Sequence, residues 1–542
     1  MNSNLKQILI IVTIIIFPQI LFAQDNAENL KNSKDAHREI VYEYNRSPTP
    51  EASADWRKSY FKITVSPQKF LYPILKHRLN VPLVHTEFDN AYPFYTEATL
   101  ELNKVRHEQL KNCWQSKEYK SLDKQADAAK ISQLESSYFP VFVHPPKVGG
   151  NNNSITPEKE KEIYNRLSKV YQLLEKGSRS RFFKWDENNE LRGVATQMAF
   201  ISDIRKLGIY LANKADWEIR NKNYDDAVKT IKVGLTMSNH VINSPISLFV
   251  SALAGNGINN VMHRQLLHLI SQPDAPNLYP ALTQLRPNFN ALPNIANSEK
   301  FGFVFYKPIK KELWANIDKA SESECKDIVE QIAELFYAVS FLDYETSEVF
   351  KNRDYSRTKV FSAFCIFSYM PAKQRLRERG FSEEKINSLS LCQVIAPYAI
   401  EKINDAYDHL CVASTFKPFE VRDTVYWAER DLYKKLFSDA NSTVDYLLML
   451  ITPGVSAGQD SIFRTDQLFD VLKITEAIRH YIAVHDGKLP ESLDVIKETP
   501  IPKTDLFSGK PYIYKVEGKK ITIEYATWNT EKPDSRLEIV VE

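Results

Sequence analysis

The chain of 542 residues is poor in glycine and lacks the short motifs that mark many nucleotide and metal sites. It has only 15 glycines, while lysine, glutamate and leucine occur throughout, which favours helices over a turn-rich β architecture. It contains no P-loop, no G-x-G-x-x-G and no C-x-x-C pair. The sequence therefore offers no motif for a nucleotide, a dinucleotide or a cysteine-bound metal.

An excess of charge of one sign is also missing. Lys and Arg together number 70 and Asp and Glu number 68, so the net charge is +2. A chain with this balance has no general attraction to nucleic acid or to an anionic membrane. Its hydrophobic content of 43% and charged content of 25% are those of an ordinary globular protein.

Cysteine is scarce as well, with five residues at positions 113, 325, 365, 392 and 411. An odd number leaves at least one thiol unpaired if all bridges are internal, and five cysteines in this length are no disulfide framework. Cys365, Cys392 and Cys411 lie in apolar helical patterns. We therefore expect these three to be buried thiols.

The N-terminus has the three parts of a secretory signal peptide. Lys6 precedes the apolar run Ile8–Phe22, and the small residue Ala23 follows it. We expect cleavage between Ala23 and Gln24 and export to the periplasm or the medium. The alternative is a retained membrane anchor, but the run is shorter than the roughly 20 residues that a span needs.

Composition divides the rest of the chain into four segments. Gly149–Thr156 (GGNNNSIT) is the clearest linker, and Pro157 after it suits the first turn of a helix. The predicted segments are a flexible leader (24–54), a proline- and aromatic-rich region (55–150), a helical domain (151–467) and a C-terminal module (468–542).

Apolar periodicity predicts a series of helices in the helical domain. Ile201–Arg220 and Ala227–Val241 flank the sequence NKNYDDAV, which resembles the turn of a tetratricopeptide-type helical hairpin. No 34-residue self-similarity accompanies it, so a full repeat array is not predicted. Gly380 and Ser382 form a predicted helix stop and N-cap. Further helices are expected at Ser247–Ile270, Ile309–Phe350, Pro371–Arg379, Glu383–His409 and Asp423–Ile451.

Aromatic residues gather before Met370 in the helical domain. Their spacing predicts a stripe that faces the core rather than a cofactor site. They are Phe361, Phe364, Phe367 and Tyr369.

Residues 468–542 predict a small α+β module. Apolar residues recur at steps of three and four over Leu468–Ile482, which describes one face of a helix that ends at Gly487. Tyr512–Val516 and Ile521–Tyr525 are predicted to form a β-hairpin, and residues 537–541 alternate as a third strand. The predicted fold class is mainly α, with helical hairpins that are tetratricopeptide-like in part, plus this C-terminal module.

Two family resemblances accompany these patterns. The order of a helix, GKLPESL, a proline spacer and DLFSGKPYIY resembles the C-terminal module of type II secretion pseudopilins. Over Leu71–Tyr514 the chain is similar to a family of secreted, uncharacterised proteins from planctomycete-type bacteria, through segments such as LKHRLNVPLVHTEFDNAYPFY and MPAKQRLRERGFSEEKINSL. The second resemblance implies a mostly helical secreted protein and no particular activity.

One pattern suggests a nucleophilic serine. Gly454–Gly458 (GVSAG) matches the nucleophile-elbow motif with Ser456 at its centre. That motif needs a strand, a strained turn and a helix, with an acid and a histidine later in the chain. The downstream histidines, His480 and His485, lie on a predicted helix. In the secreted family that the chain resembles, this position is a loop between two helices, and we favour that interpretation.

The histidines do not form a recognisable metal motif. His107 and Glu108 begin like a zinc-protease helix, but Lys111 stands where the second histidine ligand belongs. His480 and His485 are five residues apart, so they lie on different faces of a helix. The same applies to His263 and His268.

Acidic and basic clusters have structural explanations too. The adjacent carboxylates Asp225–Asp226 and Glu383–Glu384 lie at predicted helix starts, where they complement the helix dipole. Arg375–Arg379 contains three arginines and suits a solvated turn. Asp505 is a candidate for holding a cation in its turn, as the pseudopilin resemblance suggests.

These observations favour an exported, non-enzymatic helical protein that binds or scaffolds a protein partner in the cell envelope. No catalytic residue, cofactor, metal or nucleic-acid partner is predicted. The alternatives are a secreted hydrolase whose site assembles only in space, and a component of an envelope or secretion assembly.

Overall fold

The computed structural model describes residues 41–42, 60–70, 77–80, 86–121, 130, 156–184, 194–244, 249–285, 287–295, 319–341, 357–421, 443–526 and 535–541. Its helices are α2 (Tyr92–Gln115), α3 (Lys117–Lys120), α5 (Pro157–Arg166), α6 (Ser168–Ser178), α8 (Val194–Arg220), α9 (Tyr224–Ile242), α10 (Phe249–Ile270), α11 (Tyr279–Thr283), η5 (Asn288–Ala291), α14 (Glu322–Phe341), α15 (Arg357–Glu378), α16 (Glu383–Asn387), α17 (Leu391–Ala413), α18 (Pro418–Val421), α20 (Thr443–Val484) and η7 (Leu493–Val495). Its strands are β1 (Val41–Tyr42), β2 (Tyr60–Val65), β3 (Phe88–Asn90), β4 (Ser180–Phe182), β5 (Ile513–Glu517), β6 (Lys520–Tyr525) and β7 (Ser535–Val541).

The predicted fold class is confirmed: the chain is mostly helical, with a small sheet that contains the β5–β6 hairpin. The sheet has the order β1-β2-β7-β6-β5. Its third C-terminal strand, β7, pairs antiparallel with β6, as the alternation at residues 537–541 predicted. The alternating side chains Leu537, Ile539 and Val541 are buried.

The sequence did not predict that the N-terminal region joins this sheet. Strand β2 lies parallel to β7, with Tyr60 opposite Arg536 and Val65 opposite Val541. Ile63 and Val65 are fully buried. A parallel pairing needs a long connection, and here the connection includes all the helices. The two ends of the described chain are therefore held side by side.

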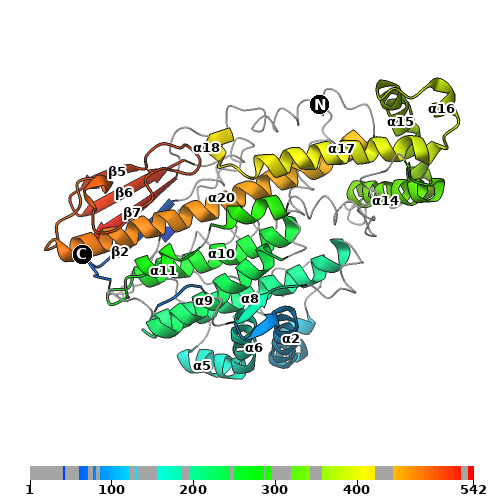
Figure 1. The fold of residues 1–542 in the computed structure, drawn as a ribbon. Coiled ribbons are helices and arrows are strands. Elements are labelled where there is room, and N and C mark those ends of the chain that lie inside the picture. Colours follow the sequence, from blue (N-terminus) through cyan, green and yellow to red (C-terminus); the bar gives the residue numbers. More distant parts are fainter. Residues whose placement is uncertain are drawn as a thin grey trace.

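Helix α20 is the long axis of the molecule. It is 42 residues long, with the sheet against its C-terminal half and α15 and α16 beyond its other end (Figure 1). It packs against α10, α11, α15 and α17. The predicted boundary between residues 467 and 468 therefore falls inside one helix.

Two hydrophobic clusters meet along α20. Ile462 and Phe463 belong to a core formed largely by α14, α15 and α17. From Leu468 onward the helix belongs to a larger core that contains α2, α6, α8, α9, α10 and the sheet. One continuous helix thus links both cores.

Several helix ends lie where the sequence placed them. Gly380 and Gly487 adopt positive φ after α15 and α20, and Ser382 accepts a hydrogen bond from the amide of Lys385 at the start of α16. The expected helix start at Pro371 is wrong, because α15 begins at Arg357 and continues through the proline. Packing against α14 and α17 supports α15 in spite of the amide hydrogen bond that Pro371 cannot make.

Gly177 allows a close approach between α6 and the ring of Tyr95 on α2. A β-carbon at position 177 would overlap with that ring, which is fully buried and bonded to His240 through its hydroxyl. A β-carbon at Gly234 would instead meet the flexible side chain of Met262.

We expect Gly177→Ala to lower the free energy of unfolding by about 1–3 kcal/mol, because a rigid ring cannot yield. Gly234→Ala is the matched control in a buried helix and should cost less than about 1 kcal/mol. Urea unfolding of both variants tests this. Equal losses would contradict the steric explanation.

Candidate functional site

The serine in the nucleophile-elbow pattern does not lie on an elbow. Gly454–Gly458 falls inside α20, which runs without a break from Thr443 to Val484. The prediction of a loop between two helices at this position is therefore wrong. Proline and glycine lower the intrinsic helix preference of this stretch, but packing of α20 against other helices overrides it. The strand and strained turn that activate such a serine are missing at this position.

The two histidines of α20 have separate structural partners. His480 accepts a hydrogen bond from the amide of Phe70 at 3.3 Å, and its ring lies 3.9 Å from the Phe70 ring centroid. His485 contacts Glu498 at 2.6 Å. This arrangement agrees with the prediction that the two histidines lie on different faces of the helix.

The other sequence candidates have structural roles as well. His107 packs edge-on against Trp114, and Glu108 pairs with Arg166 at 2.9 Å. The carboxylate pairs lie in the first turns of α9 and α16, as predicted. In the described part of the chain, no group of three or more histidine, cysteine or acidic side chains is arranged to hold a metal ion. The predicted cleavage site, Ala23 and Gln24, lies outside the described residues.

Asp505 organises the turn before β5. Its Oδ1 accepts hydrogen bonds from the amides of Phe507 and Ser508, and its Oδ2 accepts them from Gln467 Nε2 and the amide of Ala526, at 2.6–2.8 Å. Burial raises the pKa of the Asp505 carboxyl. Because N–H donors contact both oxygens, this carboxylate ties the turn to α20 and the sheet.

The five cysteines are all at least partly buried. Cys113, Cys325 and Cys365 are buried, while Cys392 and Cys411 are partly buried. Burial raises the pKa of Cys325 and of Cys365 to about 11. A thiol with such a pKa is almost entirely protonated near neutral pH and is a poor nucleophile.

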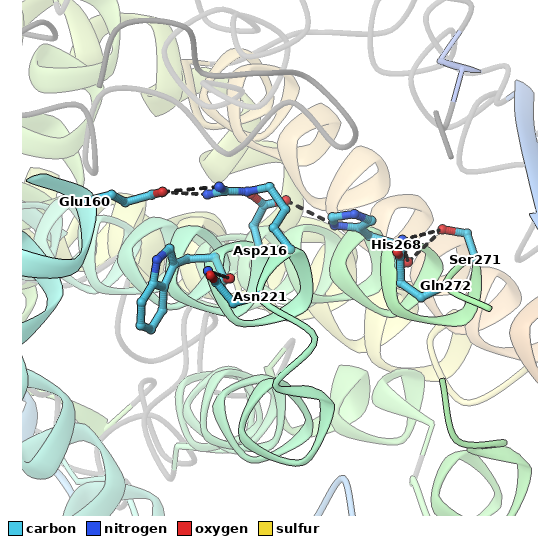
Figure 2. Close-up of polar contacts among 8 residues, drawn as sticks. Glu160, Asp216, Asn221, His268, Ser271 and Gln272 are labelled. Atoms are coloured by element: carbon cyan, nitrogen blue, oxygen red, sulfur yellow. Dashed lines mark hydrogen bonds and ion pairs between the residues drawn. The ribbon is translucent and has the colours of Figure 1, made fainter. Parts of the chain in front are cut away.

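A histidine–carboxylate pair that the sequence did not predict joins α8 to α10 (Figure 2). Asp216 Oδ1 lies 3.1 Å from His268 Nδ1, and both side chains are almost fully buried. Asp216 Oδ2 accepts a hydrogen bond from Arg220, which also pairs with Glu160 on α5. Ser271 donates to the carbonyl oxygen of His268 and not to its ring. The cluster therefore cross-links three helices.

A buried ion pair on α20 ties this helix to the chain after β2 and to the chain between α10 and α11. Arg479 Nη1 donates to Glu476 Oε2 at 2.7 Å, and neither side chain is exposed. The other guanidinium donors bind the carbonyl oxygens of Ser66, after β2, and Ala275, after α10. Glu476 Oε1 accepts from the amide of Leu278. Burial raises the pKa of the Glu476 carboxyl.

We expect Arg479→Met to lower the free energy of unfolding by about 3–5 kcal/mol, because it leaves Glu476 buried without its partner. The double variant with Glu476→Gln should lose less. Arg536→Met, which removes a partly exposed pair with Glu538, should cost less than about 1 kcal/mol. Urea unfolding would contradict this if the variants at 479 and 536 lost equal stability.

Two buried histidines predict sensitivity to acid. Burial lowers the pKa of His240 to about 4 and that of His263 to about 3. The unfolded chain binds these protons near pH 6.5, where the folded chain does not. The free energy of unfolding should therefore fall as the pH drops below about 6.5, by roughly 1.4 kcal/mol per pH unit for each histidine.

His263→Gln tests this, because a glutamine amide can still donate to the carbonyl oxygen of Leu468 that His263 contacts at 3.2 Å. We expect a smaller loss of stability between pH 6 and pH 4 in urea titrations. An unchanged pH dependence would show that His263 is already protonated when folded.

The outer side of α15 carries large apolar side chains in solvent. Ile366, Phe367 and Met370 are 69%, 63% and 61% exposed. We call these three residues the α15 outer face. They occupy positions i, i+1 and i+4, so they share one side of the helix. This helix lies at the end of the molecule remote from the sheet (Figure 1).

The predicted core stripe before Met370 is thus correct for Phe364 and wrong for Phe367. Phe364 is fully buried, and Phe361 and Tyr369 are partly buried. The sequence contains a sign of the outward face, because residues 364–367 (FCIF) are all apolar. Four successive residues cover a whole helical turn, so they cannot all face one core.

Among the described residues, no helix is long and apolar enough to cross a membrane. Comparison of the chain with protein-family models, curated proteins and solved structures found no match.

Proposed function

We propose that this protein is an exported helical binding or scaffold protein that docks a protein partner of the cell envelope on the α15 outer face. The single observation that carries the proposal is the group of three large apolar side chains, each more than 60% exposed. Phenylalanine and methionine are enriched in protein interfaces, and grouped apolar residues on a surface mark interaction sites.

Two further observations support export and a rigid presentation of this face. The N-terminal pattern of Lys6, an apolar run and Ala23 supports secretion. The inner side of α15 is anchored by Phe364, Cys365 and Leu376 in a core shared with α14 and α17. A partner would meet a preformed helix, which lowers the entropic cost of binding.

The experiment is an affinity pull-down from envelope extracts with the tagged full chain. The test variant is Ile366→Gln/Phe367→Gln/Met370→Gln, since glutamine keeps a high helix propensity. Leu100→Gln is the control, because Leu100 on α2 is 65% exposed but lies on a different helix.

We expect the wild type and Leu100→Gln to retain the same protein and the triple variant to lose at least about 90% of it, as for a hot-spot cluster. Circular dichroism should show equal helix content in all three. Equal capture by all three would reject the α15 outer face as the binding surface.

A further inference from the structure

Residues 66–70 follow β2 and lie against α20. The amide of Gln68 donates to the carbonyl oxygen of Arg479 at 3.1 Å, and the Arg479 guanidinium donates to the carbonyl oxygen of Ser66 at 3.1 Å. Asn277 donates to the carbonyl oxygen of Gln68 at 3.0 Å. Backbone, amide and guanidinium groups keep the same charge between about pH 4 and about pH 8. The contacts of residues 66–68 therefore do not themselves respond to pH.

The last residue of this segment, Phe70, is held by a group that can change its charge. Its amide donates to Nδ1 of His480 at 3.3 Å. A ring nitrogen that accepts a hydrogen bond carries no proton, so His480 is a neutral imidazole with its proton on Nε2. In acid a second proton binds Nδ1, and both ring nitrogens are then donors. The protonated ring cannot accept from the Phe70 amide.

The side chain of Phe70 makes an apolar contact at the same point. Its ring centroid lies 3.9 Å from that of His480 and 5.7 Å from that of Tyr279, on α11. Phe70 and Tyr279 are only 6% and 5% exposed. Phe70 is thus a buried ring that bridges α20 and α11, and it sits directly beside the titratable imidazole.

Several charged groups act on the His480 ring. Lys69, beside Phe70, and His485 on α20 disfavour its protonation, while Glu498, in the chain after η7, favours it. Glu498 is itself in contact with His485 at 2.6 Å. The neighbouring Phe70 ring also favours a cation. Burial opposes protonation most strongly, and the net result is that the pKa of His480 is lowered from its ordinary value.

We propose that His480 is a pH-sensitive switch, which holds Phe70 against α20 and α11 at neutral pH and releases it in acid while β2 stays in the sheet. The two parts of the chain are held differently, because β2 is paired with β7 along its whole length, from Tyr60 to Val65. Only Phe70 depends on the protonation of one side chain. The switch is independent of the α15 outer face.

The linkage between protonation and opening sets the size of the effect. Once Phe70 is released, His480 has an ordinary pKa near about 6.5 and takes up a proton that the closed form excludes until a lower pH. The population of the open form should therefore rise by up to about 10-fold for each pH unit below about 6.5. The rise ends where the pH reaches the lowered pKa of the closed form.

Hydrogen exchange of the full chain, followed by mass spectrometry, tests the switch. The test variant is His480→Asn, because the asparagine Oδ1 occupies the place of Nδ1 and accepts from the Phe70 amide at any pH. The measured quantity is the protection factor of the peptide that contains residues 66–70. From about pH 6.5 to about pH 5.5 it should fall by up to about 10-fold more in the wild type than in the variant.

The peptide that contains β7 separates local opening from opening of the whole sheet. Its protection should change with pH by the same factor in the wild type and in His480→Asn. A larger change in the wild type for this peptide too would mean that the sheet opens with Phe70, and would overturn the switch. An equal pH response of residues 66–70 in both proteins would overturn it as well.

Two further variants keep the His480 ring in place. His485→Asn is the matched control on the same helix, and it should retain the pH response of the wild type, since His485 contacts Glu498 and not the Phe70 amide. Lys69→Glu changes an exposed residue. It should weaken the response, because a carboxylate beside the closed imidazole lets it accept a proton at higher pH. A response lost in His485→Asn, or unchanged in Lys69→Glu, would contradict the assignment to His480.

Discussion

The buried pair of Arg479 and Glu476 is the contact on which the arrangement of β2, the helices α10 and α11, and α20 depends. Two charges without access to water are tolerated only when nearly every donor and acceptor is satisfied. Here the required partners are backbone groups after β2, after α10 and before α11. Asn277 strengthens the junction by donating to the carbonyl oxygens of Gln68 and Glu476. The pair therefore specifies how the N-terminal strand, the central helices and α20 meet.

Around this junction, α20 connects the two hydrophobic cores. Its first half shares a core with α14, α15 and α17, and its second half shares a core with α8 to α11 and the sheet. Strand β2 closes the arrangement by pairing with β7. The C-terminal segment is consequently built into the molecule through α20 and β2.

The surface of α15 contrasts with the polar clusters inside the molecule. Asp216 with His268, and Tyr95 with His240, are buried between helices and bonded to neighbouring groups, so they hold elements together. On α15 the situation is reversed, because apolar side chains are exposed to water. Exposure of Ile366, Phe367 and Met370 costs free energy, at about 25 cal/mol per Å² of apolar surface. That cost is removed when another surface covers them, which is why we propose the partner site there.

Local patterns determined the helical class, the β5–β6 hairpin, the helix ends at Gly380 and Gly487, and the N-cap at Ser382, because these depend on neighbouring residues. Tertiary structure decided the rest. The pairing of β2 with β7 joins residues nearly the whole chain apart, and α20 runs through a proline and two glycines because other helices pack along it. Periodicity identifies apolar residues on α15, but only the positions of α14 and α17 determine which of them are covered and which remain in solvent.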